Sequence, residues 1–106
     1  MLRSWQTEWD SAETAQSQGN QGKVRVCLRR ALGAWIIEMH PQYATVCGHD
    51  AMKILHALAD DIGQDAIVRT AAQRLAGGLR AQLEGGSYSQ YPFDDARVII
   101  EYFRGE

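Results

Sequence analysis

The feature that most constrains this chain is a repeat of apolar residues at helical spacing between residues 23 and 39. The stripe consists of Val24, Leu28, Ala31, Leu32, Trp35 and Met39. Its members lie three or four positions apart, which places them on one face of an α-helix. Val26, Ile36 and Ile37 lie off that stripe, and a helix that is apolar on more than one side is usually buried on more than one side. We therefore predict that this helix is central to a bundle or also lines a dimer interface.

The same periodicity predicts four further helices, whose limits are set by glycine, proline and N-cap residues. They are expected from residue 2 to about 16, from Gly48 or Asp50 to Asp61, from Asp65 to Leu83, and from Asp94 or Asp95 to Phe103. No segment shows the strict alternation of apolar and polar residues that is typical of a half-buried strand. The sequence predicts an all-α fold, a single up-and-down helical bundle of four to five helices that forms one domain over residues 1–106.

The stretch QSQGNQGKVRV contains Gly22-Lys23 and raises the question of a phosphate-binding loop. Such a loop requires a glycine, four residues, and then Gly-Lys-Ser or Gly-Lys-Thr after a strand. Here Ser17 stands at the first glycine position and Val24 at the hydroxyl position, and the preceding segment reads as a helix. We interpret the stretch as the start of the central helix at Asn20 or Gln21.

Four basic residues, Lys23, Arg25, Arg29 and Arg30, occupy the first two turns of this helix and form the candidate site for an anion or a partner. Arg25 and Arg29 are four residues apart and share one face, whereas Arg30 points to a different side. The alternative is that these residues form ion pairs within the chain. The available carboxylates include Glu13, Asp60 and Asp61. A net charge of −2 argues against binding of nucleic acid by the chain as a whole.

Residues that could bind a metal or carry out acid-base catalysis are sparse. Cys47 and His49 are close in sequence, but a structural zinc site requires four ligands. The doublets Asp60-Asp61 and Asp94-Asp95 stand at predicted helix ends, where solvation, capping and the helix dipole explain them. We predict no metal site, no cofactor and no catalytic residue, and nothing in these residues requires an enzyme.

The loop that precedes the last helix contains two tyrosines with two possible roles. Tyr88 and Tyr91 would present aromatic side chains to a partner, or Tyr91-Pro92-Phe93 would form a hydrophobic staple at the helix start. The staple is the favoured interpretation.

The N-terminal stretch MLRSWQTEWDS has no apolar core of a signal peptide, and the chain contains only two cysteines, Cys27 and Cys47. No apolar stretch approaches the roughly 20 residues that cross a bilayer as a helix. We therefore expect a cytoplasmic protein without a membrane partner.

Three stretches resemble the HEPN-type helical bundle proteins, and more narrowly their small bacterial members of unassigned function. They are GNQGKVRVCLRRALGAWI, DAMKILHALADD followed by DAIVRTAAQRLAG, and FDDARVIIEYF. The resemblance covers most of residues 3–103. It implies a bundle of four or five helices, often a homodimer, that acts beside a nucleotidyltransferase or within an RNA-cutting toxin or defence system.

The ribonucleases of this family carry an arginine, four to six further residues, and then a histidine. No arginine stands at that distance before His40, His49 or His56. The resemblance therefore implies a non-catalytic bundle that acts as a dimeric binding or assembly partner. Its alternative is an RNA- or nucleotide-binding protein of the ribonuclease and toxin-defence type.

Overall fold

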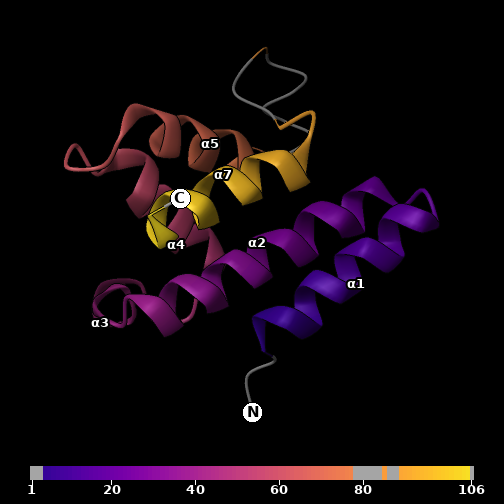
Figure 1. Ribbon diagram of the computed structural model, residues 1–106, viewed down its shortest axis with the longest axis horizontal. Coiled ribbons are helices and arrows are strands. Elements are labelled where there is room, and N and C mark those ends of the chain that lie inside the picture. The colour runs from indigo at the N-terminus through magenta and orange to yellow at the C-terminus, as the bar shows by residue number, and fades with distance from the viewer. Residues whose placement is uncertain (1–3, 78–84, 86–88, 106) are drawn as a thin grey trace. The chain divides into compact units, whose positions relative to one another are not determined.

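The computed structural model describes residues 4–77, 85 and 89–105 (Figure 1). Within these ranges the chain forms six α-helices and no strand, which confirms the predicted all-α class. The helices are α1 (Trp5–Ser17), α2 (Gln21–Met39), α3 (Gln42–Cys47), α4 (Ala51–Asp60), α5 (Ala66–Ala76) and α7 (Pro92–Arg104). None of the helices in the described ranges combines the length and apolarity that a membrane crossing requires.

The chain divides into two compact units, Met1–Ile54 and Leu55–Glu106. The boundary falls inside α4, so one continuous helix contributes residues to both units. The formation of a single domain over residues 1–106 stays a prediction.

In the first unit, α1 and α2 lie side by side with opposite directions (Figure 1). The Ser4 side chain accepts a hydrogen bond from the Thr7 N–H at 3.2 Å and caps α1. The Asn20 side chain caps α2 in the same way, because its Oδ1 accepts the Lys23 N–H at 3.1 Å. Between the helices Gly19 has a φ of +73°, a conformation that glycine adopts without steric cost. The predicted start of α2 is thus confirmed.

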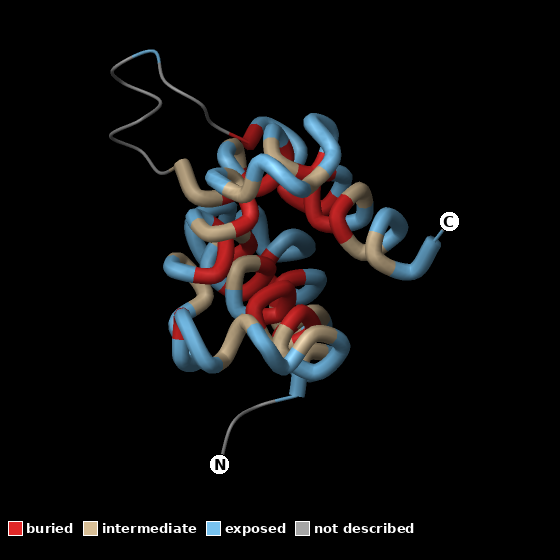
Figure 2. The backbone as a smooth tube through the Cα atoms, turned by 90° about the vertical axis from the view of Figure 1, so that its left-hand side faces the viewer, coloured by how far each residue is buried: buried red, intermediate tan, exposed pale blue. Residues whose placement is uncertain are grey.

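The apolar residues of α2 are buried around much of the helix, as the pattern predicts (Figure 2). Its buried side chains include Val24, Cys27, Leu28, Ala31, Leu32, Trp35 and Ile36. Two apolar residues are exceptions: Val26 is 39% exposed, and Met39, at the last position of the helix, is 51% exposed. The chain turns away there ahead of Pro41, and the expectation that Met39 belongs to the core is wrong.

A close approach within the first unit brings Gly33 of α2 against Ala51 at the start of α4. A Cβ atom at Gly33 would lie 3.1 Å from both the Cα and the Cβ of Ala51. This contact explains why α2 tolerates a glycine in its interior, where glycine costs about 1 kcal/mol relative to alanine. It also fixes the segment that precedes α4 beside the middle of α2.

The short helix α3 was not expected from the sequence. It spans only six residues, too few to show a helical period, and it follows Pro41, which is tolerated at the start of a helix. It ends at Gly48, whose φ is +61°. The described chain therefore contains one helix more than the upper limit of the predicted number.

In the second unit, α4 ends at Asp60 rather than Asp61, and Ile62 is 87% exposed. Ile62 continues the apolar spacing of Leu55 and Leu58 and would be expected in the core, but it is exposed because the helix that would have turned it inward has already ended. The Arg69 Nε of α5 donates a hydrogen bond of 3.1 Å to the Ala59 carbonyl of α4. One of the carbonyl groups that the end of α4 leaves without a partner within the helix is satisfied in this way.

The observed limits of α5 and α7 both differ from the predicted ones. Helix α5 ends at Ala76, because Gly77 takes an extended conformation, whereas the prediction continued the helix to Leu83. Leu79, Leu83, Tyr88 and Leu2 lie outside the described residues.

Helix α7 begins at Pro92 rather than at Asp94 or Asp95, since the fixed φ of proline suits the first helical position. Pro92 and Phe93 are buried, but Tyr91 is 70% exposed. Tyr91 therefore does not form the predicted staple.

The Gly33 contact leads to a first prediction. We expect Gly33→Val to lower the free energy of unfolding by about 1–3 kcal/mol, because its side chain would overlap the backbone of Ala51. Gly22→Ala is the matched control, since a Cβ there meets only the Asn20 Oδ1 at 3.9 Å. Urea unfolding followed by circular dichroism compares the two variants. Equal stability of both would contradict the close packing of α2 on α4.

Candidate binding cavity on α2

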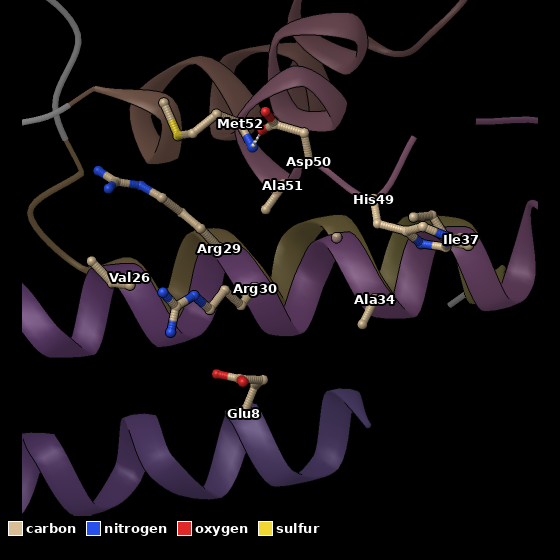
Figure 3. A pocket seen from close by; sticks show the side chains of 11 residues that line it. Glu8, Val26, Arg29, Arg30, Ala34, Ile37, His49, Asp50, Ala51 and Met52 are labelled. Carbon is tan, nitrogen blue, oxygen red and sulfur yellow. Dashed lines mark hydrogen bonds between the residues drawn. The ribbon is translucent and has the colours of Figure 1, made fainter. Parts of the chain in front are cut away.

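A cavity of about 640 Å³ lies along α2 in the first unit (Figure 3). Its α2 residues are Val26, Arg29, Arg30, Gly33, Ala34 and Ile37, and its other lining residues are Glu8 of α1 and residues 49–52. The volume lies within the range of about 300–1,000 Å³ that is typical of ligand sites. It is partly open to solvent.

The position of the cavity follows from the period of α2. At about 100° per residue, residues 26, 30, 33 and 37 form a stripe on the side of α2 opposite to the stripe of Leu28, Leu32 and Trp35. The core stripe is buried, whereas Val26 at one end of the cavity is 39% exposed. The small residues Gly33 and Ala34 stand at the middle of the cavity stripe, where they leave the helix surface hollow.

The charged residues of the cavity balance one another. Arg29 and Arg30 contribute two positive charges, and Glu8 and Asp50 contribute two negative ones. The Asp50 Oδ1 accepts hydrogen bonds from the Met52 N–H at 3.0 Å and the Lys53 N–H at 3.2 Å. Asp50 therefore caps the N-terminus of α4. Glu8 is only 4% exposed. The cavity therefore combines both signs of charge with apolar surface, rather than presenting one positive face.

The four basic residues predicted as a site are placed differently from one another. Arg29, which is half-buried, and Arg30, which is exposed, both line the cavity. Arg25 is half-buried and lies outside the cavity lining, and Lys23 is exposed in the first turn of α2. The cavity thus joins Arg29 with Arg30, although the sequence suggested that Arg25 and Arg29 act together.

Sequence reasoning missed the part of the cavity that α2 does not supply. Glu8 has the charged side chain of a surface residue, but it lies three residues after Trp5 and four before Ala12, within the buried stripe of α1. This helical spacing from Trp5 and Ala12 is the feature of the sequence that indicates a buried carboxylate. Residues 49–52 gave no such signal, because a tertiary contact, that between Gly33 and Ala51, places them beside α2.

Figure 3 shows how the polar side chains are distributed along the cavity. His49 lies toward the Ile37 end, whereas Arg29 and Arg30 project from the half of the stripe that contains Val26. The described residues contain no group of three or more His, Cys, Asp or Glu that could hold a metal ion. Cys27 and Cys47 are both buried free thiols, and buried free cysteine behaves as a small apolar residue.

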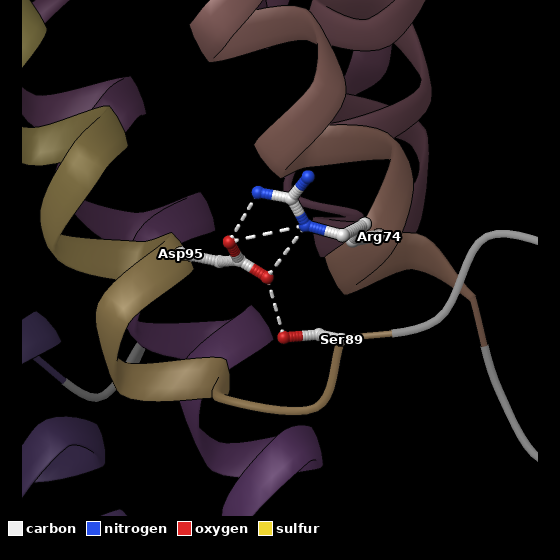
Figure 4. Close-up of polar contacts among 3 residues, drawn as sticks. All are labelled: Arg74, Ser89 and Asp95. Carbon is white, nitrogen blue, oxygen red and sulfur yellow. Dashed lines mark hydrogen bonds and ion pairs between the residues drawn. The ribbon is translucent and has the colours of Figure 1, made fainter.

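A second polar cluster lies in the second unit, between α5, α7 and the residue Ser89 (Figure 4). The Arg74 Nε donates to both carboxylate oxygens of Asp95, at 3.2 and 3.1 Å, and the Arg74 Nη2 donates to Oδ1 at 2.6 Å. The Ser89 hydroxyl donates to Asp95 Oδ2 at 2.6 Å. The hydrogen bonds that Arg74 donates to Asp95 outweigh the effect of burial and raise the pKa of Arg74 above its ordinary value.

The geometry of this cluster is that of a buried polar contact between α5 and α7. Ser89 is 2% exposed, so a substrate cannot reach its hydroxyl, and it faces a carboxylate already bound by Arg74. The capping role predicted for Asp94-Asp95 is wrong, because α7 starts at Pro92 with Tyr91 at the N-cap position, and the Asp95 side chain joins the helix to α5 instead. Both residues do lie in the first turn of α7, where the helix dipole favours acidic side chains.

No protein-family model, curated protein or solved structure matches this chain. The resemblance to HEPN-type bundles therefore stays a prediction from the three stretches of sequence.

The Arg74–Asp95 pair gives a second prediction. Asp95→Ala should lower the free energy of unfolding by about 1–3 kcal/mol, because it leaves Arg74 and Ser89 without their shared acceptor. The expected loss of stability is smaller than for a fully buried ion pair, since the Arg74 side chain is 38% exposed. Asp94→Ala is the control, because Asp94 is exposed and lies 3.6 Å from Arg97. It should change stability by less than about 0.5 kcal/mol.

Chemical denaturation of the two aspartate variants at neutral pH measures the difference. A loss of stability that is the same for both positions would show that Asp95 has no special role in joining α5 to α7.

Proposed function

We propose that this protein is a non-catalytic helical module of the cytoplasm that binds and assembles with another protein. The observation that carries the proposal is the cavity on α2, which offers apolar surface and charges of both signs over several turns of one helix. Protein interfaces combine an apolar centre with polar groups at its edge, and arginine is enriched in them. The resemblance to HEPN-type bundles suggests a nucleotidyltransferase as one such partner.

Self-association through apolar helix surfaces belongs to the same proposal. Large apolar side chains are exposed outside the cavity, and they include Met39, Val46, Ile62 and Ile67. Single exposed apolar residues are common, and a homodimer would bury those that lie in its interface.

The dimer can be tested by light scattering coupled to gel filtration. We expect a dimer mass that is unchanged between low and moderate salt, because apolar contacts do not depend on screening of charge. A monomer at every concentration would remove self-association from the proposal.

The alternative function is binding of RNA or a nucleotide. It is favoured by the clustering of Lys23, Arg25, Arg29 and Arg30 in the first half of α2. Such binding should weaken steeply with salt and when Arg25 and Arg29 are replaced. The carboxylates of Glu8 and Asp50 in the cavity oppose a polyanion, so we place this function second.

The proposal predicts the effect of filling the cavity. We expect Ala34→Trp to abolish recovery of the partner when the tagged protein is purified from its native host, because the new side chain would occupy the hollow beside Gly33. Gln16→Trp is the matched control, since it adds the same side chain to an exposed position of α1 outside the cavity. Quantitative mass spectrometry compares the proteins recovered with each variant.

Two results would contradict the proposal. One is the recovery of the same proteins with Ala34→Trp and with the unchanged protein. The other is recovery of RNA or nucleotide without any protein in stoichiometric amount, which would favour the alternative function.

A further inference from the structure

We propose that the cavity on α2 accepts a short amphipathic helix of a partner protein, and that an acidic side chain of this helix pairs with Arg30. The inference rests on the proposed function and names the chemistry of the segment that the cavity would bind. Its grounds are the shape of the cavity, the environment of Arg30 and the charge balance of the lining.

The length of the cavity stripe suits a helical segment. Val26 and Ile37 are eleven residues apart on α2, which corresponds to roughly 16 Å at 1.5 Å per residue. A partner helix of three turns has the same length. Ala34, at the middle of the stripe, has a small side chain, and small residues allow the surfaces of two helices to approach closely.

Arg30 is the cation in the cavity that is placed to meet a partner. It is exposed, and its guanidinium forms no hydrogen bond or ion pair with another residue in the described part of the chain. Its neighbours along the stripe are Val26 and Ala34, one turn away on either side. A carboxylate on the partner would therefore meet Arg30 beside apolar contacts, where partial removal of water strengthens the pair.

The charge balance of the cavity distinguishes a protein segment from a nucleic acid. Two carboxylates, those of Glu8 and Asp50, line the same cavity as Arg29 and Arg30. The negative charges of these two carboxylates would act against the successive phosphates of an RNA, because like charges brought close together oppose binding. A helix with one acidic side chain among apolar ones can place its charge at Arg30 and keep neutral surface elsewhere.

The test uses the full-length protein and a displayed library of random 12-residue peptides as the probe. We expect the selected peptides to share one Asp or Glu flanked by apolar residues at spacings of three and four. Their affinities for the protein and its variants are then measured by fluorescence anisotropy, and far-ultraviolet circular dichroism verifies that each variant is folded.

Charge reversal provides the decisive comparison. Arg30→Glu should weaken binding of the selected peptides about tenfold or more, and a peptide whose acidic residue is replaced by Lys should regain affinity for this variant. Lys23→Glu is the matched control, because it makes the same change of charge on α2 at an exposed position outside the cavity. It should leave the affinity within about twofold.

Comparison of Ala34→Trp with Arg30→Glu separates the proposed docking of a partner in the cavity from the proposed pairing of an acidic side chain with Arg30. Suppose that Ala34→Trp abolishes binding of the peptides, but that Arg30→Glu weakens their binding no more than Lys23→Glu does. The cavity is then a docking surface, and the proposal that an acidic side chain of the partner pairs with Arg30 is wrong. If Ala34→Trp does not block them, the cavity is not the docking surface and both proposals fail.

Three further results would overturn the inference. The first is a selection without any enriched peptide, and the second is binding of a 12-nucleotide RNA that depends on Arg30 where the peptides do not bind. The third is a dimer that Ala34→Trp dissociates, because this result would assign the cavity to a second copy of the chain.

Discussion

The arrangement of the first unit depends on how closely α4 can approach α2. Gly33 has no side chain, so Ala51 lies against the backbone of α2, at a distance where a Cβ atom would be only 3.1 Å away. The contact holds residues 49–52 beside α2 and makes them one wall of the cavity. A larger residue at position 33 would fill the site and displace its wall at the same time, so the packing of the fold and the shape of the cavity have a single cause.

Charged residues have two different roles in this molecule, and their surroundings decide which. Arg74 and Asp95 satisfy each other across two helices, with Ser89 as an additional donor, so their charges are used within the fold. Arg30 is exposed beside apolar residues in the cavity, where its charge can contribute to the recognition of a partner. A count of basic and acidic residues does not distinguish these roles, because it contains neither distance nor burial.

Much of the fold could be predicted because local chemistry sets it. The apolar stripe of α2, the N-cap at Asn20 and the glycine before it gave the start and the buried face of that helix. The errors lie where the decisive partner is distant or the element is short. The sequence places Asp95 at the start of a helix, but the partner that decides its role is Arg74, which stands 21 residues earlier. Helix α3 is too short to show a helical period. The charge of Glu8 suggests an exposed residue, whereas its spacing from Trp5 and Ala12 places it on the buried face of α1.

The sequence by itself determined the all-α class, the face of α2 that is buried and the presence of four basic residues near its start, since helical period and capping act over a few residues. Only the tertiary structure decided which of these residues share a site. Arg29 and Arg30 diverge on an isolated helix, yet both line one cavity, because α1 supplies Glu8 on one side and the start of α4 packs on Gly33 on the other. Such contacts depend on shape and distance between helices, and these are not encoded in the spacing along any single one.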